Sequence, residues 1–356
     1  MSEMQTDYFK NLNGFRGLAA LSILLFHSRI DCFKTLWIGV PVFFALSGFL
    51  ITRILILSKT GPNYFKRFYF RRALRIFPIY YLVLVVSVAW CYASKGSFKL
   101  LLYFVLYLQS FPVSLSIEPR YFYGRMNYTW SLSVEELFYF AWPLIVLICS
   151  EKALKKICIV LGLSGLLFKL IPILFFYSSK TDPFVFASLP GSIDALMAGA
   201  FLGILSLKKK EDLYSFFPRH SLQISLLAFS TIFVLYYQNF ESAVHFSVFK
   251  FLLNLAALLL SFTGIAWLIS DKSVLAQRLF NNRFMQLTGN ISYGLYLYHY
   301  LIYIIIWTVA KNFNLNFSSW IFLPLQIITT YIVAILSWNL IERPLLKLKN
   351  KAFNDK

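Results

Sequence analysis

The sequence predicts an all-α, polytopic membrane protein with ten transmembrane helices, on the basis of its composition and its hydrophobic runs. Hydrophobic residues make up 59% of the 356 residues and charged residues only 14%, which is outside the range of soluble globular domains. Runs of about 20 apolar residues, the length that crosses a bilayer as a helix, recur along the whole chain. The ten predicted spans are 14–31, 36–57, 76–93, 130–149, 157–177, 189–207, 221–238, 248–270, 289–308 and 319–341.

An eleventh apolar run, 98–114, is shorter, and the basic residues decide whether it crosses. If it does not cross and the N-terminus is cytoplasmic, most of the 34 Lys and Arg residues face the cytoplasm, as the positive-inside rule requires. If it crosses, the basic clusters at 152–156 and 208–210 and the basic tail all move outside. We therefore expect cytoplasmic termini, with 98–126 as a re-entrant or interfacial element that covers a site on the outer face.

The spans form one unit in this prediction: a membrane domain over residues 1–346, followed by a basic cytoplasmic tail over 347–356. The net charge of +19 would suggest a nucleic-acid partner in a soluble protein. In a membrane protein the same excess reflects the positive-inside bias. The expected partner is therefore the lipid bilayer, and no nucleic acid is expected.

Two ionisable residues, Arg16 and His27, lie in the first hydrophobic run, LNGFRGLAALSILLFHSRI. At 1.5 Å per residue they stand about 16 Å apart along a helix, on nearly the same face. Ionisable side chains in a membrane span are costly and usually face the bundle interior or a water-filled cavity. This stripe is therefore the first candidate for a functional site.

Six motifs then carry a resemblance to a known family. They are R-x10-H from Arg16 to His27, GVPVFFALSGFLITR (39–53), RRALRIFPIYY (71–81), WSLSVEELFYFAWPL (130–144), GNISYGLYLYHY (289–300) and IERP (341–344). Together, in this order, they resemble the integral-membrane acyltransferase family three over nearly the whole chain. The resemblance implies a protein of the bacterial inner membrane that O-acylates surface sugars.

His27 is the candidate general base. Acyl transfer to a sugar hydroxyl requires removal of the hydroxyl proton, and imidazole suits this role near neutral pH; the resemblance also implies a catalytic histidine here. The alternative is a histidine that is hydrogen-bonded within the bundle for packing. Arg16 cannot release its proton, so we expect it to bind an anionic group of the donor or to fix a carboxylate. The alternative for Arg16 is a snorkelling residue at the end of a span.

Arg71, Arg72 and Arg75 are the candidate donor-binding residues, at the cytoplasmic start of the third span. Residues three and four apart are neighbours on a helix surface, and guanidinium groups bind phosphate bidentately. The cluster therefore suits the nucleotide end of coenzyme A, as the RRxxR pattern of the family also implies. The alternative is a cluster that serves topology and anionic lipid.

Glu135 and Glu136 lie in the fourth span and point about 100° apart on a helix, so only one can face a given cavity. The resemblance favours Glu135 as the third catalytic candidate. It could orient His27 as a carboxylate does in a hydrolase triad, pair with an arginine, or form a structural ion pair.

The roles of two further residues stay open. Asp194 is an acid inside a span, but where the family often has an arginine two residues earlier this chain has Ser192. His299, on a tyrosine-rich helix, is as consistent with packing as with an active site. We expect no metal site, because the four histidines are scattered and no cysteine pair has ligand spacing.

These residues lead to one interpretation and one alternative. We interpret the chain as a membrane O-acyltransferase that moves an acyl group, expected to be acetyl, from cytoplasmic acetyl-CoA to a saccharide hydroxyl. An example of such a surface saccharide is lipopolysaccharide O-antigen, in a free or a lipid-linked form. Direct transfer and a covalent acyl-enzyme are both open. The alternative is a transporter or flippase of lipid-linked saccharide, against which the chain shows no duplicated halves.

Overall fold

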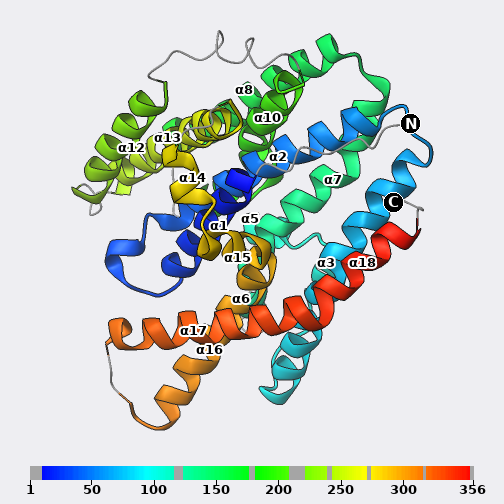
Figure 1. Ribbon diagram of the computed structural model, residues 1–356. Coiled ribbons are helices and arrows are strands. Elements are labelled where there is room, and N and C mark those ends of the chain that lie inside the picture. The colour runs from blue at the N-terminus through cyan, green and yellow to red at the C-terminus, as the bar shows by residue number, and fades with distance from the viewer. Residues whose placement is uncertain are drawn as a thin grey trace.

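The computed structural model describes residues 10–115, 123–175, 181–207, 221–238, 243–270, 274–315 and 318–352. Within these residues every regular element is a helix, and the long helices lie beside one another as a bundle (Figure 1). Helices dominate because backbone polar groups at membrane depth must be paired within the protein. The predicted all-α fold is confirmed.

The long helices are α1 (Lys10–Phe26), α2 (Gly39–Ser58), α3 (Tyr64–Ala93), α7 (Trp130–Ile148), α8 (Glu151–Phe175), α10 (Leu189–Leu205), α12 (Ser221–Gln238), α13 (Ala243–Ser270), α16 (Ser292–Asn312) and α17 (Ser319–Ser337). Shorter helices are α4 (Leu101–Val105), α5 (Ser110–Ser114), α6 (Tyr123–Met126), α9 (Thr181–Phe186), α14 (Val274–Phe280), α15 (Arg283–Asn290) and α18 (Arg343–Ala352). A π-helical turn, Trp338–Glu342, joins α17 to α18.

Eight helices in the described part of the chain are long and apolar enough to cross a membrane. They coincide with eight of the predicted spans. The other two predicted spans coincide with α1 and α12. Helix α1 has only 17 residues, and the described apolar part of α12 is Ser221–Thr231. A polytopic membrane protein is therefore supported, whereas the count of ten spans is not confirmed.

The first span ends earlier than the predicted residue 31. Helix α1 ends at Phe26, and Arg29, three residues later, has a φ of 63°. This left-handed conformation is incompatible with a continuing right-handed helix. His27 therefore lies one residue beyond α1 and not within it, so its side chain is at a helix end.

Helix α10 is enclosed by α2 and α8, and the contact with α2 depends on glycine. A Cβ atom on Gly199 would stand 1.8 Å from the carbonyl oxygen of Ala45, and one on Gly48 would stand 2.0 Å from that of Leu196. Small residues let two helix backbones approach closely, as in other membrane proteins. This contact fixes α2, which carries Ser47, against α10, which carries Asp194.

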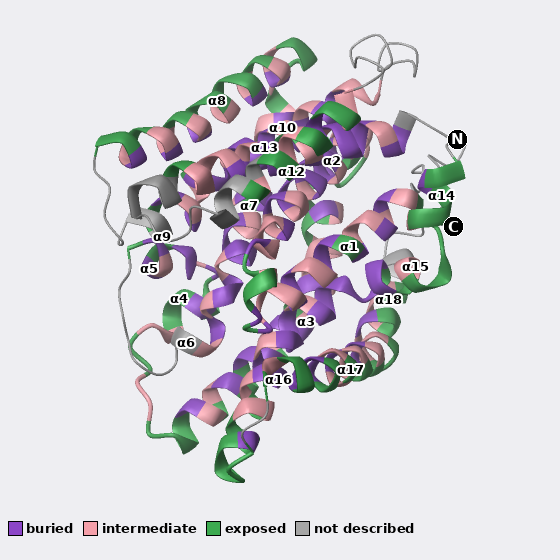
Figure 2. Cartoon of the chain, turned by 90° about the vertical axis from the view of Figure 1, so that its left-hand side faces the viewer, coloured by how far each residue is buried: buried purple, intermediate pink, exposed green. Residues whose placement is uncertain are grey.

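Helix α8 lies at the periphery of the bundle. Only 22% of its apolar segment is buried, compared with 67% for α10, and Figure 2 shows its exposed residues on the outward side. The exposed side chains are large and apolar: Ile159, Val160, Leu163, Leu167, Ile171, Leu174 and Phe175. Such a surface suits contact with lipid and not with water.

The described residues of segment 98–126 form only short helices. These are α4, α5 and α6, which have five, five and four residues, far fewer than the about 20 that a span requires. The described residues are therefore consistent with the predicted non-spanning element. Its position on the outer face stays a prediction.

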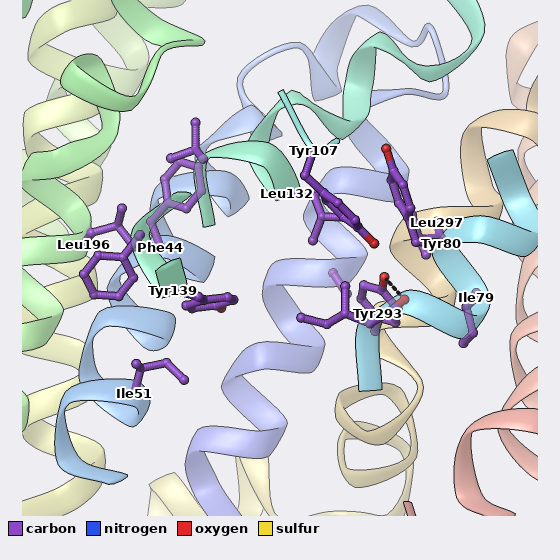
Figure 3. Packing of buried hydrophobic residues seen from close by; sticks show 14 of the residues in the cluster. Phe44, Ile51, Ile79, Tyr80, Tyr107, Leu132, Tyr139, Leu196, Tyr293 and Leu297 are labelled. Carbon is purple, nitrogen blue, oxygen red and sulfur yellow. Dashed lines mark hydrogen bonds between the residues drawn. The ribbon is translucent and has the colours of Figure 1, made fainter. Parts of the chain in front are cut away.

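Hydrogen bonds attach this segment to α3 and α7. The Tyr80 hydroxyl donates to the carbonyl oxygen of Phe104 at 2.7 Å, and the Ser133 hydroxyl donates to that of Tyr107 at 2.6 Å. The rings of Tyr107 and Tyr80 stack with centroids 4.2 Å apart (Figure 3). Burial raises the pKa of the Tyr107 phenol far above its ordinary value, so this ring stays neutral.

The close contact between α2 and α10 makes a testable prediction. Gly199→Ala should lower the stability of the folded protein by at least about 1–3 kcal/mol, because the added methyl group overlaps the backbone of Ala45. Thermal unfolding in detergent measures the effect. Gly162→Ala on α8 is the control, because its Cβ would meet only the Met197 side chain at 3.7 Å. Equal melting temperatures of both variants would contradict this description of the contact.

Candidate active site

A cavity of about 580 Å³ lies beside His27. Residues of α1, α2, α7, α8, α10, α13 and α16 line it, together with residues of α9 and of segment 31–38. Much of the lining is aromatic: Phe26, Trp37, Phe44, Tyr128, Trp130, Phe186 and Tyr296. The described residues of 98–126 do not line it, and their hydrogen bonds hold them against α3 and α7. Residues 116–122 lie outside the described part of the chain, so the expectation that this segment covers the site stays a prediction.

His27 and His299 meet in the wall of this cavity. His27 Nδ1 lies 3.2 Å from His299 Nε2 and 3.0 Å from the carbonyl oxygen of Ile23. His299 Nδ1 in turn lies 2.6 Å from the carbonyl oxygen of Tyr296. His299 is fully buried, whereas His27 is half-buried and lines the cavity. The two histidines, which are 272 residues apart in the sequence, therefore form a pair.

A second, smaller cavity of about 50 Å³ extends the site towards Arg16. Arg16 and Glu135 line it, and it shares a set of lining residues with the larger cavity. The shared residues are Ile23, Val40, Phe44 and Tyr296. The two cavities are therefore neighbours along α1, separated only by these side chains.

Glu135 does not orient His27. Its Oε1 accepts a hydrogen bond of 2.6 Å from the Ser47 hydroxyl, and the Tyr139 hydroxyl donates to Ser47 at 3.1 Å. The Glu135 carboxylate also attracts the guanidinium of Arg16. The structure therefore favours the alternative in which Glu135 pairs with an arginine. Figure 3 shows Tyr139 on the same side of the core as Phe44.

Three arginines converge at the other end of α1. The positive charges of Arg72 and Arg75 on α3 lie close enough to repel that of Arg16. Glu342, in the π-helical turn, offsets them: it is 4% exposed, and its carboxylate attracts Arg75 and Arg16. The π-helical turn widens the helix at this point, a distortion that is frequent at functional sites.

Arg72 also contacts the aromatic ring of Tyr139 on α7. Its guanidinium lies 4.6 Å from the ring centroid of Tyr139, within the range of a cation–π interaction. Arg71, the third predicted donor-binding residue, is half-buried on the same turn of α3. Arg72 and Arg75 of the RRxxR pattern thus lie in one region with Arg16, and their role in donor binding stays a prediction.

Asp194 has a partner that the sequence did not identify. Lys169 of α8 donates to Asp194 Oδ2 at 2.7 Å and to Asn254 Oδ1 at 2.6 Å. The side chains of this ion pair are 3% and 1% exposed, and all three residues line the larger cavity. Lys169 thus supplies the positive charge that Ser192 cannot. The sequence does contain a sign of this ion pair: Lys169 lies inside an apolar span, where a charged side chain needs a partner.

Comparisons with known proteins identify the family of the chain. A family described as "Acyltransferase domain", acyltransferase family three, matches residues 9–339. Because this match covers most of the chain, the chain belongs to that family. No solved structure matches it significantly.

Two relatives carry names that state a substrate. Peptidoglycan O-acetyltransferase OatA of Listeria monocytogenes is 28% identical over 371 residues, which cover 96% of this chain and 56% of that protein. YrhL of Bacillus subtilis, provisionally named a peptidoglycan O-acetyltransferase, is 28% identical over 95% of this chain and 55% of its own length. The chain therefore spans about half the length of the curated relatives that it matches.

The buried ion pair makes a second prediction. Lys169→Met should destabilise the protein by about 3 kcal/mol, because it leaves the Asp194 carboxylate buried without a positive charge. Adding Asp194→Asn should restore part of this stability. Lys155→Met on the same helix is the control, because its ion pair with Glu151 is partly exposed and contributes at most about 1 kcal/mol. Thermal unfolding in detergent compares them, and equal losses would contradict the assignment.

Proposed function

We propose that this chain is a membrane O-acyltransferase that moves an acetyl group from acetyl-CoA to a hydroxyl of a cell-envelope saccharide. One observation carries the proposal. A half-buried histidine, His27, faces a large aromatic cavity, and a smaller neighbouring cavity leads from it towards an arginine cluster. The proposal keeps the predicted orientation, with the arginine cluster at the cytoplasmic side of a bacterial inner membrane.

The donor would bind at the arginine end. Arg71, Arg72 and Arg75 would contact the phosphates of acetyl-CoA, since guanidinium groups bind phosphate oxygens in pairs. Arg16, held by Glu135, would meet the donor where it enters the bundle. The pantetheine arm would then follow α1 through the smaller cavity over the about 16 Å that separate Arg16 from His27, and would deliver the thioester beside His27.

The chemistry requires a base at the acceptor hydroxyl. The hydroxyl oxygen forms a bond to the thioester carbonyl carbon while its proton passes to His27 Nε2. The tetrahedral intermediate then expels the thiolate as the C–S bond breaks, and the imidazolium of His27 returns the proton to sulfur. The products are an ester and free coenzyme A. The same proton transfers serve a saccharide hydroxyl or an enzyme hydroxyl that carries the acetyl group onward.

The larger cavity would hold the acceptor. Its volume of about 580 Å³ lies within the usual range for small-molecule sites, about 300–1,000 Å³. Aromatic side chains such as Trp37 and Trp130 offer flat surfaces to sugar rings. The names of the relatives state peptidoglycan, so we propose peptidoglycan as the first acceptor to test, ahead of the lipopolysaccharide O-antigen that the sequence suggested.

The role of His27 is directly testable. In a bacterium that lacks such enzymes, expression of the chain should add an acetyl group to envelope glycans, and His27→Ala should lower this modification at least about 10²-fold. Mass spectrometry of the isolated glycans measures it. Immunoblots of membranes check that both proteins are inserted. Full modification by a well-expressed His27→Ala variant would contradict the mechanism, and no acetylation by the unmodified chain would favour a transporter.

Donor binding is tested separately. Arg75→Gln should raise the KM for acetyl-CoA about 10-fold or more, because a charged hydrogen bond to phosphate is worth about 1.5–3 kcal/mol. Release of free thiol by membrane preparations gives KM and kcat. Arg283→Gln, on the exposed surface of α15, removes the same charge elsewhere and should leave KM unchanged. An unchanged KM in Arg75→Gln would exclude this residue from donor binding.

A further inference from the structure

His299 has a defined part in this site. We propose that it is a positioning residue that holds His27 in the tautomer whose Nε2 is free to accept a proton. The inference rests on the proposed function only where it concerns acyl transfer. The tautomer itself follows from hydrogen-bond geometry and can be measured without any substrate.

The protonation of His299 follows from its own carbonyl partner. A backbone carbonyl oxygen can only accept, so His299 Nδ1, at 2.6 Å from the carbonyl oxygen of Tyr296, must carry a hydrogen. In the neutral ring Nε2 is then an acceptor. If His299 were doubly protonated, its Nε2–H would point at His27 Nδ1, 3.2 Å away. That nitrogen already carries a hydrogen, because it lies 3.0 Å from the carbonyl oxygen of Ile23, which can only accept. His299 is therefore neutral when the pair is formed.

The protonation of His27 follows in the same way. Its Nδ1 lies 3.0 Å from the carbonyl oxygen of Ile23 and 3.2 Å from His299 Nε2. Both of these neighbours are acceptors, so His27 Nδ1 carries the hydrogen and shares it between them. The remaining nitrogen of a neutral His27, Nε2, then has a free lone pair. This is the form that a general base requires.

The surroundings keep His299 in place. Its ring is fully buried and packs edge-on against Tyr128 and Tyr303, with centroids 5.3 and 5.9 Å away. The Tyr303 hydroxyl donates to the carbonyl oxygen of Leu24 and so ties α16 to the end of α1. No carboxylate hydrogen-bonds to either histidine among the described residues. A neutral imidazole thus occupies the position that an aspartate takes in a hydrolase triad.

Two substitutions at His299 distinguish its role as a hydrogen-bond acceptor for His27 from a role in packing. His299→Phe keeps an aromatic ring but removes the acceptor, whereas His299→Gln places a side-chain oxygen close to the position of Nε2. We expect kcat to fall about 10²-fold in His299→Phe, with KM for acetyl-CoA unchanged, and His299→Gln to recover at least part of the loss. Tyr298→Phe is the control, since it removes a buried hydrogen bond to Ser337 on the same helix.

The tautomer gives an independent readout. ¹⁵N NMR of the detergent-solubilised protein with labelled histidine distinguishes Nδ1–H from Nε2–H, and His27→Asn assigns the His27 signals. We expect Nδ1–H for His27 in the unmodified chain, a shift towards Nε2–H in His299→Phe and no shift in Tyr298→Phe. An Nε2–H tautomer in the unmodified chain, or a tautomer unaffected by His299→Phe, would overturn the inference. If the tautomer behaves as expected but no acetyl transfer occurs, the proposed function fails and the positioning stands.

Discussion

The cost of placing ionisable side chains inside an apolar bundle determines much of this structure. A charge that leaves water without a partner is strongly destabilising. Here the partners come from different helices. Lys169 of α8 forms an ion pair with Asp194 of α10, and the Glu135 carboxylate of α7 accepts a hydrogen bond from Ser47 of α2 while its charge offsets that of Arg16 on α1. Each of these contacts joins side chains of two different helices.

These ionisable groups line two neighbouring cavities. Lys169 and Asp194 line the larger cavity, and Arg16 and Glu135 line the smaller one. The arginine cluster is at one end and the histidine pair at the other. A single helix thus connects a surface suited to an anionic donor with a site suited to proton transfer.

The histidine pair orients the proposed base without placing a second charged group beside it in the membrane. A carboxylate beside the base would bring a second charge into a low-dielectric region and would itself need a partner. A neutral imidazole fixes the ring of His27 through the same kind of hydrogen bond without that charge. Glu135, the carboxylate that the sequence suggested for this role, is instead used next to Arg16.

The sequence by itself determined the helical class, most of the spans and the stripe from Arg16 to His27, because these depend on composition and on spacing along one helix. It also predicted that 98–126 does not cross, because the positive-inside rule then places most basic residues on one side. The tertiary structure alone decided the partners: His299 for His27 and Lys169 for Asp194. Such pairs join residues that are far apart in the chain, and a hydrophobic pattern records which face of a helix is buried but not which helix covers it.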